Sequence, residues 1–403
     1  MNGPLHGIRI IDQSNMLMAP YATQILGDMG ADVIKIESPE GDPVRGIGPM
    51  RNPGMGAIYL NANRSKRSVV IDLKQPEGRS ALLDLVRNAD VFLSNLRPRS
   101  LDGLGLGWRD LSAINPRLVY ANLFGFAQDG PYADYPAFDD LIQGAVALPW
   151  LSHRADGGPA RYAPTAIVDR GVALWAVGQI NAALFARERG AGGQHIEIPM
   201  FEMMASLVLA DHLAGETFSP PMGEPGYVRM LNPHRRPFQT LDGYICVMIY
   251  TDRHWASFFK ALGEEAQYKA DERYRSMTTR TQNIQAIYGE LSERLLTRTT
   301  AQWMELMREA DVPAIPMHTL ASLIDDPHLA QTGFLQSLEH PSEGTLRAIA
   351  YPSRWTQTQP AATRPAPRLG EHTHEVLTEI GYSPERIAAL EKSKAIGCLK
   401  AAA

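Results

Sequence analysis

Asp169 is the residue whose type and surroundings offer the clearest chemistry in the chain. It follows the β-branched pair Ile167 and Val168 and precedes an apolar run at 171–187 with helical periodicity. At the N-cap of that helix, its carboxylate would accept backbone N–H bonds at the positive end of the dipole, which favours ionisation. An ionised carboxylate can attack an activated acyl group. On spacing alone a structural cap is the stronger interpretation, because Asp is a preferred cap residue.

A second acidic pair, Asp139 and Asp140, stands in the motif PAFDDLIQ. These carboxylates either lie near Asp169 or begin another helix, and residue type alone favours the second interpretation. Neither acidic motif has a His or Cys at the i, i+4 spacing of a metal site, so no metal is predicted.

Phosphate-binding loops are not indicated in their usual forms. The glycines of GLGLG (103–107) lack the flanking strand and helix of a dinucleotide fingerprint, and GxxxxGK[ST] does not occur, so NAD and ATP sites are not predicted. Arg97 and Arg99 follow a predicted strand, and ligands bind at the carboxyl ends of strands in open α/β sheets. The two arginines either meet a phosphate there or form a solvated basic surface.

The histidines are scattered, and none stands in a GxSxG-type elbow, so a serine or cysteine hydrolase is not predicted. His234, in NPHRRPF, is the strongest polar candidate among them. A loop histidine without a role is nevertheless the favoured interpretation.

The elements that must position these residues alternate between strand and helix. β-Branched runs predict strands, and stretches with apolar positions at helical spacing lie between them. This alternation predicts a parallel α/β sheet. The predicted strands are 7–12, 31–37, 68–74, 91–96, 117–126 and 194–200, and the clearest helices are 21–30, 76–89 and 171–187.

A second lobe is predicted, since 403 residues exceed the roughly 250–300 over which one core grows. A Gly- and Pro-rich stretch after residue 215 marks its start. It holds a hairpin at 239–250 with Asp242 and Gly243 in the turn, followed by three helices. A Pro-rich connection then leads to a last helix. The three helices are predicted at 253–262, 282–297 and 300–310, and the connection at 356–372.

Composition restricts the class of protein. The net charge of −5 argues against nucleic-acid binding, which needs a basic surface. The start of the chain does not read as an export signal, and no run of eighteen apolar residues predicts a membrane span. Cys246 and Cys398 are far apart and form no CxxC pair, so a reduced cytoplasm is the expected location.

The chain resembles the class III coenzyme A transferases of the CaiB/BaiF type, the family that includes formyl-CoA:oxalate transferase. The likeness runs from the first strand to the last helix and is carried by eight motifs in family order. They are LHGIRIIDQS, MAPYATQILGDMGADVIKIESPEGDPVR, NRSKRSVVIDLK, SNLRPRSLDGLGLGW, NPRLVYANLFGFAQDGP, PAFDDLIQ, TAIVDRGVALWAVGQINAALFARERGAGGQHIEIPMFE and PRLGEHTHEVLTEIGYS.

The resemblance implies covalent catalysis on Asp169, through an acyl anhydride and an aspartyl-CoA thioester, with Asp139 assisting nearby. A CoA thioester is then the substrate, with no tightly bound cofactor. Family members often carry Gln where this chain has Leu17, and a basic residue where it has Ser38. The residues that the resemblance places against CoA are Met16, Leu17, Met18, Ala19, Lys66, Arg67, Asn95, Leu96, Arg97 and Arg99.

The family architecture implies a large lobe with a Rossmann-like parallel sheet, a smaller α+β lobe, and two chains interlocked as a homodimer. The large lobe is expected at 1–215 together with 330–403, and the small lobe at 216–329. An acyl-CoA donor and a carboxylate acceptor are the expected partners, with neither nucleic acid nor membrane.

Two other functions remain possible from the sequence. An α-methylacyl-CoA racemase shares the fold and needs an acid and a base, but racemases carry a His where this chain has Phe138. A CoA-binding protein without catalysis follows if Asp169 only caps its helix. Several cations could bind a second carboxylate, which favours a dicarboxylic or hydroxy-acid acceptor, with succinyl-CoA as a plausible donor. These cations are Arg45, His153, Arg154, His234, Arg235 and Arg236.

Overall fold

The computed structural model describes residues 3–399, which form two compact units. The first unit comprises Met1–Val146, Pro164–Ser206 and Pro327–Ala403, and the second comprises Ala147–Ala163 and Leu207–Asp326. Both ends of the chain therefore belong to the first unit. The sequence had placed 147–163 in the large lobe, whereas the structure groups it with the second unit. Helix α7 (Leu148–Asp156) in this segment has no buried residue.

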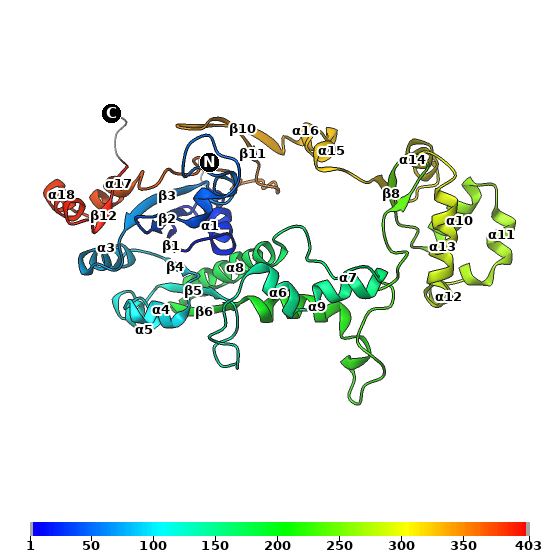
Figure 1. The fold of residues 1–403 in the computed structure, drawn as a ribbon, viewed down its shortest axis with the longest axis horizontal. Helices are drawn as coiled ribbons and strands as arrows, with labels where there is room; N and C mark the ends of the chain where they lie inside the picture. Colours follow the sequence, from blue (N-terminus) through cyan, green and yellow to red (C-terminus); the bar gives the residue numbers. More distant parts are fainter. Residues whose placement is uncertain (1–2, 400–403) are drawn as a thin grey trace. The chain divides into compact units, whose positions relative to one another are not determined.

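The first unit is built on a seven-stranded sheet with the order β12-β3-β2-β1-β4-β5-β6 (Figure 1). Its strands are parallel except β12, which runs antiparallel to β3. The order from β3 to β6 is that of the dinucleotide-binding doubly wound fold. The predicted parallel α/β sheet is thus confirmed. The strands are β1 (Arg9–Gln13), β2 (Asp32–Glu37), β3 (Lys66–Ile71), β4 (Val91–Ser94), β5 (Val119–Phe124), β6 (Gln194–Pro199) and β12 (Ile396–Gly397).

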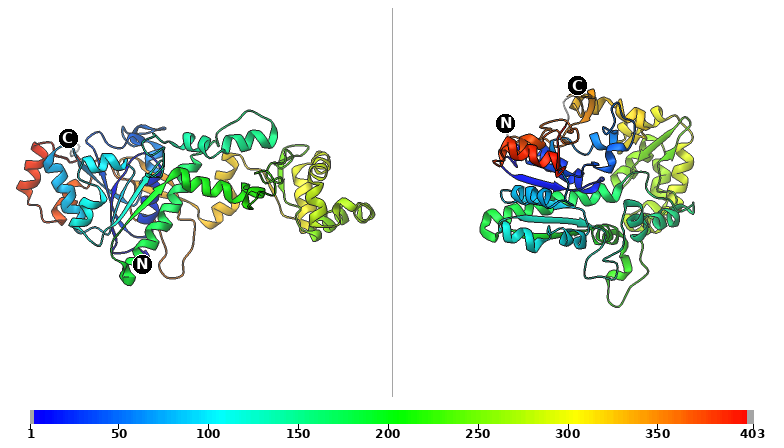
Figure 2. Two further views of the ribbon diagram at one scale, coloured as in Figure 1. Left: turned by 90° about the horizontal axis from the view of Figure 1, so that it is seen from below. Right: turned by 60° about the vertical axis from the view of Figure 1, so that its left-hand side comes forward.

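Helices cover both faces of this sheet. Figure 2 shows the red C-terminal helices and the green helix α8 on opposite sides of the blue strands. One face packs α3, α5, α17 and α18 into a core that includes Leu82, Phe92, Val376 and Leu390. On the other face α1 packs against α8. The helices are α1 (Met18–Asp28), α3 (Pro76–Val86), α4 (Pro98–Gly103), α5 (Trp108–Ile114), α6 (Asp139–Ala145), α8 (Ile167–Ala186), α17 (Thr373–Glu379) and α18 (Pro384–Lys392).

The topological switch point lies between β1 and β4, which are neighbours in the sheet. The chain continues from β1 into α1 and from β4 into α4, and the two connections lead to opposite faces. A crevice forms where such connections diverge, outside the carboxyl ends of the strands. The candidate site lies there.

Shorter elements complete the first unit. The hairpin of β10 and β11 was not foreseen, because its strands alternate mostly between exposed and half-buried residues and carry a weak apolar signal. The single last helix predicted after the Pro-rich connection is two short helices followed by β12. These additional elements are α2 (Ala57–Leu60), α16 (Pro327–Thr332), β10 (Leu335–His340) and β11 (Gly344–Ile349); α9 (Met200–His212) crosses the boundary to the second unit.

The second unit contains a three-stranded sheet and several helices around a core of Phe258, Phe259, Trp303 and other apolar residues. The predicted hairpin is present, with Phe238 opposite Ile245 in an antiparallel pair. Its elements are β7 (Phe238–Gln239), β8 (Tyr244–Val247), β9 (Ala314–Pro316), α10 (Asp252–Ala261), α11 (Glu265–Ala270), α12 (Met277–Gln282), α13 (Ile284–Leu295), α14 (Thr300–Glu309) and α15 (Leu320–Ile324).

None of the helices within residues 3–399 combines the length and the apolar character needed to cross a bilayer.

Candidate active site

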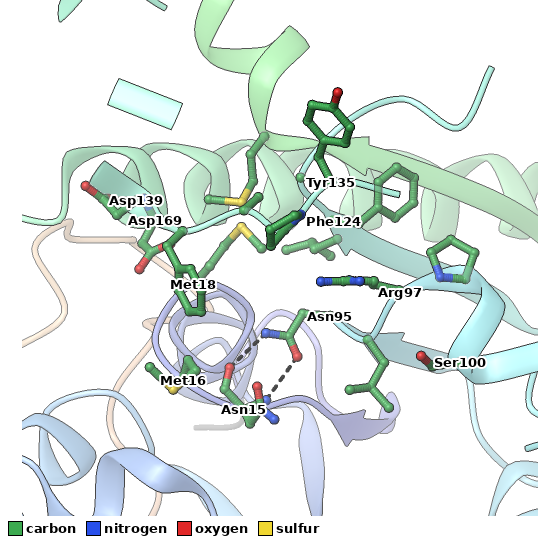
Figure 3. Close-up of a pocket in the computed structure, with 18 of the residues that line it drawn as sticks. Asn15, Met16, Met18, Asn95, Arg97, Ser100, Phe124, Tyr135, Asp139 and Asp169 are labelled. Atoms are coloured by element: carbon green, nitrogen blue, oxygen red, sulfur yellow. Dashed lines mark hydrogen bonds between the residues drawn. The ribbon is translucent and has the colours of Figure 1, made fainter. Parts of the chain in front are cut away.

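A pocket of about 390 Å³ opens at the carboxyl ends of the central strands (Figure 3). Its wall is formed by the turns after β1 and β4, the end of β5 and the loop that leads into α6. Asp139 and Asp169 lie together on one side, and the Arg97 side chain points inward from the other. The residues used below are Asn15, Met16, Met18, Asn95, Leu96, Arg97, Phe124, Gly125, Tyr135, Phe138, Asp139, Asp169 and Met200.

Buried side chains hold the turn after β1 in place. The Asn15 N–H donates to Asn95 Oδ1 at 3.1 Å, and Asn95 Nδ2 donates to the Asn15 carbonyl at 2.9 Å. Met16 has a positive φ of 65°, which L-residues rarely adopt, and its N–H donates to Asp42 Oδ1 at 3.0 Å. Lys35 donates to the Ser14 carbonyl at 2.8 Å and also to Asp42. The strained turn is therefore clamped from two sides of the switch point.

The spacing had predicted Asp169 as the N-cap of α8. In the structure Asp169 lies in the first turn of this helix instead. The N-cap is Ala166, whose side chain has no hydrogen-bonding group. The missing acceptor comes from a different helix, because the N–H of Asp169 donates to Asp139 Oδ1 at 2.8 Å. Asp139 is the first residue of α6. Asp139 thus takes the capping role that the sequence assigned to Asp169, and the Asp169 carboxyl is left for the pocket.

The ionisation of Asp169 also differs from the prediction. Burial, followed by the negative charge of Asp139, raises the pKa of Asp169 to about 6, although Arg170 acts in the opposite direction. The helix dipole had been expected to favour the charged form. Burial and the neighbouring carboxylate outweigh it here. At neutral pH the group is still ionised, and it is a stronger base than an ordinary carboxylate.

Comparison with known proteins identifies the family of this chain. Residues 5–373 match the model of CoA-transferase family III. The chain belongs to this family. It is 34% identical over 389 residues to the succinate–glutarate CoA-transferase of Agrobacterium fabrum, covering 94% of this chain and 96% of that one. The succinyl-CoA:mesaconate CoA-transferase of Haloarcula hispanica is 31% identical, covering 94% and 97%.

A solved structure supports the same assignment. A CaiB/BaiF family protein from Brucella suis superposes with a TM-score of 0.80 at 29% identity, over 94% of this chain and 100% of that one. The predicted family and the prediction of an enzyme that transfers CoA are therefore confirmed. Both of these relatives are named as CoA-transferases, which favours CoA transfer over the racemase and over a protein without catalysis.

The structure brings part of the predicted CoA site together. Met16, Met18, Asn95, Leu96 and Arg97 all line the pocket. The other five predicted members, Leu17, Ala19, Lys66, Arg67 and Arg99, are not among its lining residues. Leu17 forms the N-cap of α1, Ala19 is fully buried in that helix, and Arg99 is exposed on α4.

Lys66 does not line the pocket, and its contacts favour a structural role over the predicted binding of CoA. Its side chain is fully buried and donates to Asp12 Oδ2 at 3.0 Å, to the Pro20 carbonyl at 2.8 Å and to Asn63 Oδ1 at 2.8 Å. Burial lowers the pKa of Lys66 to about 8 despite the nearby Asp12 charge. These contacts occupy all three of its donors. Lys66 neutralises a buried carboxylate and has no group left for a phosphate.

Arg67 and Arg45 are also engaged in ion pairs away from the pocket. Arg67 lies near the amino-terminal end of β3 and contacts Asp32 at 2.7 Å and Glu379 at 2.6 Å. Arg45 is 5% exposed and binds both Glu37 oxygens, at 2.7 and 2.8 Å. Each guanidinium is held by carboxylates, so the structure favours a structural role over the predicted binding of CoA by Arg67 and of substrate by Arg45.

The other candidate substrate cations belong to the second unit. His153 and Arg154 lie on α7, and His234, Arg235 and Arg236 lie in the connection before β7. All of the residues that line the pocket belong to the first unit. Their role in substrate binding therefore stays a prediction.

Several pocket residues were missed from the sequence. Asn15 lies three residues after the predicted strand 7–12, and Met200 is the last residue of the predicted strand 194–200, so the rule that ligands bind at carboxyl ends could have indicated them. Gly125 had a different signal, since a Gly at a strand end often marks close backbone approach. A Cβ at Gly125 would lie 2.3 Å from the Cβ of Ala137. Because glycine has no Cβ, the loop that carries Asp139 can approach the end of β5 closely. Tyr135 in that loop gave no signal.

Within residues 3–399, no group of three or more His, Cys, Asp or Glu side chains is arranged to hold a metal ion.

Proposed function

We propose that this enzyme moves CoA from succinyl-CoA to a short dicarboxylic or hydroxy acid, with Asp169 as the nucleophile. The observation that carries the proposal is the Asp169 carboxyl in a pocket at the sheet's switch point, beside Asp139, with a pKa raised to about 6. The names of the relatives support the substrate class, because glutarate and mesaconate are both dicarboxylic acids.

The reaction proceeds through exchange at two carbonyl carbons. A carboxylate oxygen of Asp169 attacks the thioester carbonyl of the donor, the C–S bond breaks, and CoA leaves as a thiolate, which gives a mixed anhydride. The thiolate then attacks the Asp169 carbonyl carbon and releases the donor acid, which leaves an aspartyl-CoA thioester. No step hydrolyses the activated acyl group.

The acceptor reverses these steps. Its carboxylate attacks the aspartyl-CoA carbonyl and displaces the thiolate, forming a second anhydride. The thiolate attacks the acceptor carbon of this anhydride, and Asp169 leaves as a free carboxylate. A carboxylate that is ionised at neutral pH yet more basic than usual suits the attack on the thioester.

Covalent capture tests the nucleophile. The enzyme is mixed with succinyl-CoA without acceptor and treated with hydroxylamine, and the peptide around residue 169 is examined by mass spectrometry. We expect a hydroxamate on Asp169 and none in Asp169→Asn. The matched control is Asp140→Asn, which removes the exposed carboxylate next to Asp139 in the sequence. We expect this variant to keep the adduct. An unmodified Asp169 with normal turnover of Asp169→Asn contradicts the proposal.

A substrate panel tests the acceptor class. Succinyl-CoA is offered with glutarate, other short dicarboxylates, a hydroxy acid and bulky monocarboxylates. We expect transfer to the short dicarboxylates and the hydroxy acid. Activity restricted to bulky monocarboxylates overturns the substrate assignment and leaves the nucleophile untouched.

We also propose that the active enzyme is an interlocked homodimer in the cytoplasm. Between Gly171 and Ala186, helix α8 carries only two polar side chains, Gln179 and Asn181, and helices that are apolar on nearly every side are normally buried. Leu174, Trp175 and Phe185 on it are 58%, 41% and 65% exposed in the single chain. A second copy that covers them supports the expected assembly. Light scattering should give twice the chain mass of 44.4 kDa, unchanged on dilution, and a monomer contradicts the assembly.

A further inference from the structure

Gln143 is a buried polar residue next to the proposed nucleophile. It lies four residues after Asp139 on α6, so both side chains are on the same side of the helix. The side chain is fully buried, and its Nε2 donates to Asp139 Oδ2 at 2.6 Å. The other carboxylate oxygen of Asp139 accepts the Asp169 N–H at 2.8 Å. Each oxygen of Asp139 therefore has its own fixed donor, one from α6 and one from α8.

Two bonds in different directions restrict the Asp139 carboxylate far more than one. With the bond to α8 alone, the group could rotate about its side-chain torsions toward solvent, since Asp139 is only half-buried. With the amide bond added, its negative charge stays against the first turn of α8. A buried amide that lacked this acceptor would carry a desolvation cost, so the arrangement also stabilises Gln143.

The charged groups that face Asp169 can be named. Asp139 approaches from α6 and Arg170 from α8 itself, where its guanidinium lies 4.0 Å from the ring centre of Tyr21 on α1. Arg97 lies across the pocket. Among these, Asp139 opposes ionisation of Asp169 and Arg170 favours it. The position of Asp139 therefore influences the pH at which the Asp169 carboxyl ionises.

We propose that Gln143 is a positioning residue, which holds the Asp139 carboxylate against the first turn of α8 and thereby sets the pH range in which Asp169 reacts. The inference rests on the proposed role of Asp169 as the nucleophile. Gln143 itself touches neither substrate nor reacting atoms in this scheme. Its effect passes through Asp139.

The test uses Gln143→Met, because this substitution keeps the side-chain length and changes no charge. CoA release in a single turnover with succinyl-CoA is followed from pH 5 to 8 with a thiol reagent that works in acid. We expect the wild-type rate to rise through about pH 6, because burial and Asp139 raise the pKa of Asp169 to about 6. We expect the rise to move to lower pH in Gln143→Met, since the Asp139 charge is no longer held in place. A purely structural amide would lower the rate at all pH values and leave the midpoint unchanged.

A double-substitution cycle shows whether the effect passes through Asp139. Asp139→Asn should move the midpoint in the same direction, and adding Gln143→Met to it should produce no further movement. Asp140→Asn removes the full charge of the exposed residue next to Asp139 and serves as the control. Its midpoint should move less than that of Asp139→Asn or of Gln143→Met. Circular dichroism and thermal melting confirm folding. If Gln143→Met does not fold, Gln143→Asn carries the test, because its shorter amide falls short of Asp139.

The outcomes separate the two proposals. An unmoved midpoint in folded Gln143→Met or Gln143→Asn, or additive movements in the double variant, overturns the role of Gln143. In that case the wild-type adduct on Asp169 still forms. Absence of that adduct in the wild type overturns the nucleophile instead.

Discussion

Replacing Asp169 by Asn should abolish transfer and also stabilise the folded enzyme at neutral and alkaline pH. In the unfolded chain the carboxyl ionises near its ordinary pKa of 3.8, whereas burial and Asp139 raise its pKa to about 6 in the fold. Between these values the unfolded chain loses the proton while the folded chain keeps it. The folded state therefore loses relative stability as the pH rises through this window, and the full cost is present above about pH 6.

The size of this cost follows from the pKa difference. One pKa unit corresponds to about 1.4 kcal/mol, so the shift sets a ceiling of about 3 kcal/mol. Asp169 is partly exposed, and solvent screening reduces the expected gain to about 1–2 kcal/mol. Asn has nearly the same shape, and the backbone N–H of residue 169 still donates to Asp139. The substitution therefore removes the charge with little other change.

Thermal melting of both proteins from pH 5 to pH 8 measures this difference. We expect Asp169→Asn to melt higher at pH 8, on the order of 1–3 °C for a chain of this length. The difference should shrink steadily toward pH 5. A difference that is independent of pH, or a variant that melts lower at pH 8, refutes the reasoning. Asp140→Asn, on the exposed neighbour of Asp139, should show no such gain.

Three further predictions concern the pocket and the buried charges. Gly125→Ala should lower kcat at least about tenfold in steady-state assays while circular dichroism stays normal, because the new Cβ would displace the facing loop. Gly130→Ala should leave kcat unchanged, since a Cβ there would lie 3.6 Å from its nearest neighbour. Arg97→Ala should raise the KM for succinyl-CoA about tenfold, with a smaller effect in high salt, and exposed Arg109→Ala should leave it unchanged. Lys66→Met should lower the free energy of unfolding by about 3–5 kcal/mol in urea titrations, because a buried carboxylate loses its partner. An increased KM with normal stability in Lys66→Met would return this lysine to the CoA site.

The sequence was sufficient to predict the sheet, but not its strand order or its edge. Six strands have β-branched runs long enough to recognise, and both β3 and β5 are buried at every position. The seventh strand, β12, consists of Ile396 and Gly397 alone and pairs with Val70 and Ile71 more than 300 positions earlier. A two-residue strand has no periodicity. Its existence depends on a tertiary contact that local pattern does not encode.

The errors at the site have a similar cause. The family resemblance placed Lys66 and Arg67 against CoA, yet their acidic partners lie 54 and up to 312 positions away in the sequence. A charge that is neutralised inside the fold and one that faces a ligand look the same in a sequence. Asp169 shows the reverse error. Its neighbours predicted a cap, and the true acceptor for its helix comes from Asp139, 30 positions earlier.

The basic residues of the first unit thus serve two purposes that only the structure separates. Lys35 is fully buried, and through Asp42 and the Ser14 carbonyl it holds the turn that gives Met16 its positive φ. Arg97 is exposed and lines the pocket, so its guanidinium meets solvent and can meet a ligand directly. The buried charges shape the crevice at the switch point, and the exposed charge is available to the substrate. A charge-neutral change at Gln143 and a charge-removing change at Arg97 should therefore affect different kinetic constants, the first the pH at which Asp169 reacts and the second the affinity for the thioester.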